Sequence, residues 1–188
     1  AAETADVIFR VKHRWLKEGR IRLADVVFSG TVESTRLVQN AILLSQDTTT
    51  AYRVAWSALL RGRLIRYGIV EALAPGFHSR DKSGARMTNG AAMLALAVAM
   101  KPERLIIAGI DLYSHPSGAY PGTPETANAY APAHDRDLER SHTLAMLQKQ
   151  IAQSGPQSLT IIGPLHDIAI QAGIALNDGR NGKSEIVP

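Results

Sequence analysis

The chain has 188 residues, with a hydrophobic content of 45%, a charged content of 20% and a net charge of +4. This length and composition predict one globular domain with a full hydrophobic core, not a disordered chain. The sequence has no cysteine, which excludes disulfides, thiolate zinc sites and cysteine nucleophiles. The basic excess favours anionic partners, among them nucleotides, phosphorylated sugars, acidic lipid surfaces and nucleic acid. We find no signal-peptide pattern and no transmembrane run in the sequence.

Short apolar runs alternate with helical patterns along the chain. Strands are predicted over residues 6–11, 25–29, 41–44, 64–67, 104–108 and 159–162. Helices are predicted over residues 51–61, 91–100, 134–153 and 165–172, with short helical segments ending at Val38 and over 70–73. The alternation predicts an α/β fold with a single-domain, mostly parallel, Rossmann-like sheet flanked by helices. We expect this domain to span residues 1–176 and to be followed by a flexible tail over 177–188.

The most informative stretch of the sequence covers residues 88–120. Residues 91–100 are apolar on nearly every face, which predicts a buried helix. Residues 104–108 predict a central strand of a parallel sheet, buried on both faces. Gly109 and Asp111 follow at the carboxyl end of this strand, the edge where ligands bind in open α/β sheets. The loop beyond is polar and aromatic together, and its notable residues are Tyr113, His115, Ser117 and Tyr120.

Several side chains in and after this stretch are candidates for chemistry. Asp111 lies at the strand end, where a cap or turn former is an equally good interpretation. Tyr113 and Tyr120 have hydroxyls that can bond phosphate oxygens, and packing within the loop is the alternative. His134 stands at the start of the long predicted helix, and an imidazole is suited to act as a general base near neutral pH, although a lone histidine is more often simply exposed. His142, two helical turns later, is the competing candidate.

The sequence also bears on metal-dependent and nucleotide-dependent classes of enzyme. Asp135 and Asp137 resemble the DxD motif of metal-dependent glycosyltransferases, but they lie where acidic residues stabilise a helix N-terminus. We prefer this capping interpretation and predict no metal site, because no zinc spacing is recognised there. The GxGxxG, Walker A and GxSxG patterns do not occur. Their absence weakens dehydrogenase, NTPase and α/β-hydrolase interpretations.

Residues 88–120 resemble the bacterial sialyltransferases of glycosyltransferase family 42. That family has a Thr-Ser-Gly turn, a small-residue helix, a strand, a Gly-Ile-Asp-Phe-Tyr segment and a second tyrosine a few residues later. The counterparts in this sequence are Thr88-Asn89-Gly90, residues 91–100, residues 104–108, Gly109-Ile110-Asp111-Leu112-Tyr113 and Tyr120. Weaker similarities in the same order cover most of the chain, at residues 6–10, 25–28, His134 and 159–168.

The resemblance implies a variant of the GT-A fold that uses a CMP-activated sugar, with sialic acid, Kdo and related nonulosonic acids as alternatives, and needs no metal or other cofactor. It implies inverting transfer to a hydroxyl of a cell-surface glycan or glycolipid, with His134 as the base and Tyr113 and Tyr120 on the leaving phosphate. The residues expected to contact the nucleotide or donor sugar are Arg10, Lys12, Thr88, Asn89, Gly90, Gly109 and Asp111. We expect a cytoplasmic enzyme without a nucleic-acid partner. Peripheral association with the inner face of the membrane and homo-oligomerisation stay open.

The sequence departs from the family in two respects. The family's first strand and its Gly-Asn-Gly-Pro-Ser nucleotide loop have no counterpart, and Lys12 stands where the family carries asparagine. Either the sequence is a piece of a longer protein, or the protein does not bind CMP in the family's usual way. The alternative hypothesis is a non-catalytic α/β module that binds a nucleotide, a phosphorylated ligand or a partner protein.

Overall fold

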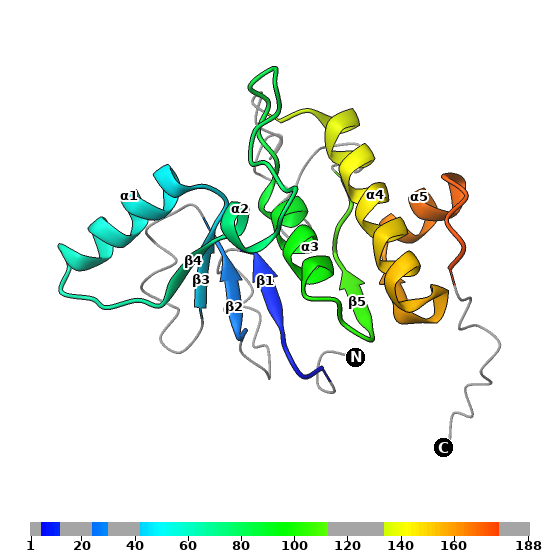
Figure 1. Ribbon diagram of the computed structural model, residues 1–188, viewed down its shortest axis with the longest axis horizontal. Helices are drawn as coiled ribbons and strands as arrows, with labels where there is room; N and C mark the ends of the chain where they lie inside the picture. The colour runs from blue at the N-terminus through cyan, green and yellow to red at the C-terminus, as the bar shows by residue number, and fades with distance from the viewer. Residues whose placement is uncertain (1–4, 12–23, 30–41, 113–133, 177–188) are drawn as a thin grey trace, which may run out of the picture.

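The computed structural model describes residues 5–11, 24–29, 42–112 and 134–176 (Figure 1). Its strands are β1 (Phe9–Val11), β2 (Val26–Phe28), β3 (Ile42–Ser45), β4 (Tyr67–Ile69), β5 (Leu105–Ala108) and β6 (Leu159–Ile162). Its helices are α1 (Thr48–Leu59), α2 (Val70–Leu73), α3 (Asn89–Ala99), α4 (Arg136–Ser154) and α5 (Leu165–Gln171), with a short 3₁₀ turn, η4 (Pro156–Ser158), between α4 and β6. The predicted helical segment ending at Val38, the loop after Leu112 and the tail over 177–188 lie outside the described residues.

All pairings between these strands are parallel, which confirms the predicted α/β class. Strands β1 to β4 form one sheet in the order β1-β2-β3-β4, and β5 and β6 form a separate pair. The prediction that residues 104–108 form a central strand is therefore wrong for the described part of the chain. There β5 has a single strand neighbour, β6, and continuous apolar character does not by itself fix the position of a strand in its sheet.

Helix α3 lies between the two sheets and joins their cores (Figure 1). One hydrophobic cluster packs α3 on the four-stranded sheet, and its α3 members are Ala91, Ala92, Ala95 and Leu96. A second cluster packs α3 against α4 and the β5–β6 pair, and its α3 members are Leu94 and Val98. No residue of α3 is exposed, which confirms the predicted buried helix. This helix needs apolar side chains on nearly every face because both its sides face a core.

Local hydrogen bonds move two element boundaries away from their predicted positions. Helix α1 begins at Thr48, because the Asp47 side chain caps it by accepting a hydrogen bond of 2.7 Å from the backbone N–H of Thr50. Strand β4 begins only at Tyr67, which pairs with Leu43 of β3. Leu64, predicted to belong to this strand, is 95% exposed and precedes it.

The remaining predicted strands and helices in the described ranges lie within three residues of their observed bounds. The predicted loop over residues 74–86 contains a turn in which the Asp81 carboxylate accepts a hydrogen bond of 2.8 Å from the backbone N–H of Ala85. In the described part of the chain, no helix combines the length and apolar character that crossing a membrane requires.

Candidate functional site

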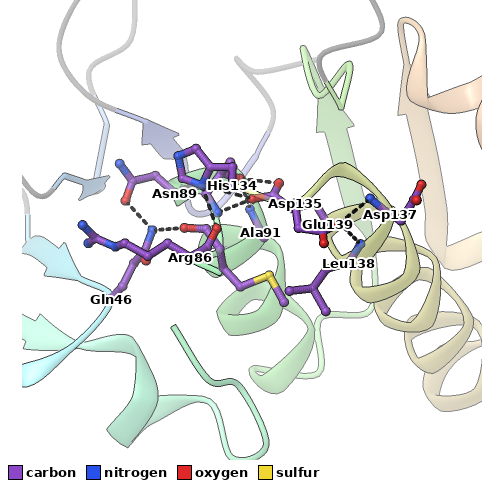
Figure 2. A network of polar contacts seen from close by, with 11 residues as sticks. Gln46, Arg86, Asn89, Ala91, His134, Asp135, Asp137, Leu138 and Glu139 are labelled. Atoms are coloured by element: carbon purple, nitrogen blue, oxygen red, sulfur yellow. Dashed lines mark hydrogen bonds and ion pairs between the residues drawn. The ribbon is translucent and has the colours of Figure 1, made fainter. Parts of the chain in front are cut away.

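The N-terminus of α3 lies at the carboxyl edge of the four-stranded sheet, surrounded by polar side chains (Figure 2). Gln46 follows the last residue of β3, and its Nε2 donates to the Met87 carbonyl at 3.0 Å and to Asn89 Oδ1 at 3.1 Å. Gln46 is only 6% exposed, so these bonds fix the turn before α3 against the end of β3. The α3-terminus cluster, as we name it, consists of Gln46, Arg86, Thr88, Asn89, His134 and Glu139.

Thr88 caps α3 and is itself held by Glu139 of α4. Its Oγ1 accepts a hydrogen bond of 3.2 Å from the backbone N–H of Ala91. Its backbone N–H donates to one Glu139 carboxylate oxygen, and its hydroxyl donates to the other at 2.9 Å. The sequence predicts that Thr88 contacts the nucleotide or donor sugar, whereas both its donors point to Glu139 in the structure. In this structure Thr88 therefore fixes the start of α3, and Asn89 and Gly90 provide the next backbone N–H groups of the helix.

Glu139 is a buried carboxyl group, with 3% of the residue exposed. Burial raises its pKa, and this effect is opposed by the two hydrogen bonds from Thr88 and by the nearby His134. The carboxylate thus connects α4, the α3 terminus and the predicted base. Helix α4 cannot shift along α3 without breaking these bonds.

His134, the predicted base, lies beside this carboxylate. Its Nδ1 is 2.6 Å from the Arg86 carbonyl oxygen and 3.9 Å from Glu139 Oε1. A carbonyl oxygen can only accept, so Nδ1 carries the hydrogen and the neutral ring keeps its basic lone pair on Nε2. The structure therefore brings His134 to the turn at the start of α3, which the sequence had singled out separately (Figure 2).

The acidic pair at the start of α4 has the capping role that we preferred for it. Asp135 Oδ1 accepts hydrogen bonds of 2.9 Å from the backbone N–H of Asp137 and 3.0 Å from that of Leu138. Asp137 lies in the first helical turn, where the negative charge of a carboxylate interacts favourably with the helix dipole. Within residues 5–11, 24–29, 42–112 and 134–176, no group of three or more His, Cys, Asp or Glu side chains is arranged to hold a metal ion.

His142, the competing candidate base, packs inside the fold. Its ring meets Phe77 edge-on, with centroids 5.7 Å apart and an angle of 66° between the planes. Burial lowers the pKa of His142, opposed by a backbone hydrogen bond with Ala91. Among the described residues its Nε2 has no hydrogen-bond partner. These surroundings are those of a packing residue.

We expect the free energy of unfolding to decrease as the pH falls below about 6.5, because burial lowers the pKa of His142 in the folded protein. Its folded pKa is lowered, so the unfolded chain takes up the proton first. This contribution is complete above the unfolded pKa and is lost as the pH falls towards the folded one. Urea unfolding across this pH range should show a weaker pH dependence for His142→Gln than for the wild type. The same change at the exposed His78 should leave it unchanged, and equal pH dependence in all three proteins would contradict the prediction.

The predicted ligand edge after β5 has an unusual backbone. Gly109 has a φ of 76° and Leu112 a φ of 50°. The left-handed region is uncommon for leucine, and such outliers often occur at functional sites. Space around a Cβ at Gly109 is open, so glycine is favoured there by its backbone angle and not by crowding. Asp111 lies between these two residues, and this segment is outside the α3-terminus cluster as defined above.

Of the remaining residues predicted to contact the donor or the leaving phosphate, the structure describes only one. Arg10 lies in β1, in register with Val27 of β2. Lys12, Tyr113 and Tyr120 lie outside the described residues, so their predicted roles stay predictions.

Sequence reasoning missed Gln46, Arg86 and Glu139. A polar residue directly after a buried strand marks the carboxyl edge of a sheet, and this signal singles out Gln46. Glu139 belongs to an amphipathic helix, where carboxylates usually face solvent, and its burial depends on the distant α3 terminus. The guanidinium of Arg86 lies 3.8 Å from an Asp47 carboxylate oxygen, another contact between segments that are far apart in the sequence.

Comparisons with protein-family models, with curated proteins and with solved structures find no match for this chain. The resemblance to glycosyltransferase family 42 therefore stays a prediction.

Proposed function

We propose that the protein is a glycosyltransferase that moves a sugar from a CMP-activated donor to an acceptor hydroxyl, with inversion and without a metal. The position of His134 carries the proposal: a histidine with its lone pair on Nε2 stands at the start of α3, at the carboxyl edge of a parallel sheet. The sugar would be sialic acid, Kdo or a related nonulosonic acid, and the acceptor a cell-surface glycan or glycolipid.

In the proposed reaction, Nε2 of His134 takes the proton of the acceptor hydroxyl while that oxygen attacks the anomeric carbon. The bond from this carbon to the CMP phosphate breaks, and its electron pair leaves with the phosphate. An ionised Glu139, 3.9 Å from Nδ1, would stabilise the imidazolium that forms. The N–H groups of Asn89 and Gly90 in the first turn of α3 are suited to the phosphate charge. Tyr113 and Tyr120 remain the predicted hydroxyl donors to the leaving group.

A non-catalytic nucleotide-binding module is the second candidate. The bonds from Thr88 to Glu139 count against the donor contact that the enzyme hypothesis assigns to Thr88, and a module that holds only a phosphate at the first turn of α3 does not need that contact. Nucleotide binding without transfer to any acceptor, and without hydrolysis of a CMP-sugar, would distinguish this module from the enzyme.

We expect CMP to bind more tightly than UDP or GDP in calorimetric titrations. Asn89→Asp should weaken CMP binding several-fold, because it places a negative charge at the helix end that would hold the phosphate. The aspartate can still accept the bond from Gln46, and a carboxylate near a helix N-terminus stabilises the helix, so weaker binding would not reflect unfolding. Gln148→Glu makes the same charge change at an exposed site of α4 and should leave affinity unchanged. Tighter binding of UDP or GDP than of CMP would reject the proposal.

A further inference from the structure

The outer side of α1 is apolar although it faces solvent. The residues that pack on the sheet are Thr50, Ala51, Val54 and Ala58. The opposite side carries Tyr52, Trp56 and Leu59, all more than half exposed, and the turn after the helix exposes Leu60 and Leu64. We name Tyr52, Trp56, Leu59, Leu60 and Leu64 the α1 apolar surface. The helix is thus apolar on two opposite sides, of which the fold uses only one.

The helical part of this surface is continuous. Tyr52, Trp56 and Leu59 are spaced by four and three residues, so they share one side of the helix. The rings of Tyr52 and Trp56 stack, with centroids 6.4 Å apart and an angle of 8° between the planes. Figure 1 shows α1 and the turn after it at the opposite end of the molecule from α5. An exposed apolar group of this kind marks an interaction site.

Positive charge accompanies the α1 apolar surface. Residues 48–70 contain four arginines, no lysine and no acidic residue. The arginines are Arg53, Arg61, Arg63 and Arg66, and all of them are exposed. Arg61 Nη1 donates to the Ser57 carbonyl at 3.0 Å, so this guanidinium lies along the last turns of α1. A partner for this end of the molecule must therefore match an apolar, aromatic and cationic surface.

We propose that the α1 apolar surface, together with Arg61 and Arg66, docks on a membrane rich in anionic lipids. Tyrosine and tryptophan favour the headgroup level of a bilayer, and exposed leucines can enter the acyl boundary. The arginines attract the acidic headgroups. In this proposal the α1 end of the molecule lies on the membrane surface at the level of the headgroups. This docking does not depend on the chemistry of His134, and it would bring the protein to the surface that carries glycolipids.

Other occupants match the surface less well. A second copy docked symmetrically would bring two sets of four arginines together, and like charges oppose such an interface. Nucleic acid would satisfy the arginines, but its phosphate backbone offers no apolar environment for Leu59, Leu60 and Leu64. An anionic bilayer satisfies both the charge and the apolar side chains.

The test uses phosphatidylcholine vesicles with and without phosphatidylglycerol. A Trp15→Phe protein leaves Trp56 as the only tryptophan, because the chain has two. We expect sedimentation with vesicles and a blue shift of Trp56 fluorescence only when phosphatidylglycerol is present, with binding reduced by added salt. Arg61→Glu with Arg66→Glu should weaken the partition about thirty-fold or more, since each basic residue near such a surface contributes about fivefold. The exposed pair Arg104→Glu and Lys149→Glu makes the same charge change elsewhere and should leave it unchanged.

A second pair of variants tests the apolar contribution. Trp56→Ser should also weaken vesicle binding, whereas Met100→Ser, at an exposed site at the end of α3, should not. Equal binding to vesicles with and without phosphatidylglycerol, or equal loss in the two charge-reversed proteins, would overturn the proposal. Two further results would overturn it. One is that the protein dimerises without vesicles and Trp56→Ser abolishes the dimer. The other is that an oligonucleotide displaces the protein from the vesicles.

Discussion

Replacing His134 with alanine should lower the rate of sugar transfer about a hundred- to ten-thousand-fold, the usual contribution of a general base. CMP affinity should stay nearly unchanged, because in the proposed reaction Nε2 acts on the acceptor hydroxyl and not on the nucleotide. Single-turnover transfer assays and calorimetry with CMP measure the two effects separately. Tyr113→Phe should lower turnover less, since it removes only one of the hydroxyl donors that we predict for the leaving phosphate and leaves the proposed base in place.

His142→Ala is the internal control for this assignment. Its imidazole packs on Phe77 within the fold, so the variant should lose stability but keep transfer activity when assayed below its unfolding temperature. Thermal unfolding of both variants separates loss of fold from loss of chemistry. If His142→Ala abolishes transfer and His134→Ala does not, the base is wrongly assigned.

Replacing Glu139 with alanine should lower the free energy of unfolding by about 1–3 kcal/mol. The change leaves the backbone N–H and hydroxyl of Thr88 without their acceptors, at a position where Glu139 is buried. For a chain of this size, each kcal/mol lowers Tm by about 2–4 °C. Glu139→Gln keeps one acceptor oxygen and should lose less stability.

The contribution of Glu139 to stability should also depend on pH. Burial raises the pKa of Glu139 in the folded protein, so this contribution is complete below the unfolded pKa. It falls as the pH rises through the higher pKa of the folded protein.

A double-mutant cycle shows whether Glu139 acts through Thr88. The effects of Glu139→Ala and Thr88→Val should fall short of additivity by about 0.5–3 kcal/mol, because both changes remove the same contact. Glu71 is a matched control, since its carboxylate also accepts a backbone bond, of 2.8 Å from Ser79, but it belongs to an exposed residue. Water can replace that bond in Glu71→Ala. A larger loss for Glu71→Ala than for Glu139→Ala, measured by urea unfolding, would refute this role of burial.

Local sequence patterns were sufficient to predict the class of the fold and much of its local structure. Continuous apolar runs of strand length, separated by helical patterns, bury their side chains only in a parallel sheet covered by helices. The apolar character of residues 91–100 likewise predicted a buried helix, because a helix with no polar side has no side to expose. The acidic residues before α4 indicated its cap, since N-capping depends on neighbours only a few residues away.

How these elements meet could not be predicted from the sequence. The contact between Thr88 and Glu139 joins residues 51 positions apart, and that between Gln46 and Asn89 joins residues 43 positions apart. Such contacts leave no periodic pattern in the sequence, because they depend on how α3 packs on the sheet and on α4. The same reason explains why β5 could be recognised as a parallel strand but not placed. Its apolar pattern predicts burial on both faces, but only Ile107 is buried and Ala108 is exposed, because the neighbours of a strand are set by the path of the whole chain. His134 could be proposed as a base from its sequence position, but the Arg86 carbonyl that sets its tautomer and the neighbouring Glu139 carboxylate come from the fold.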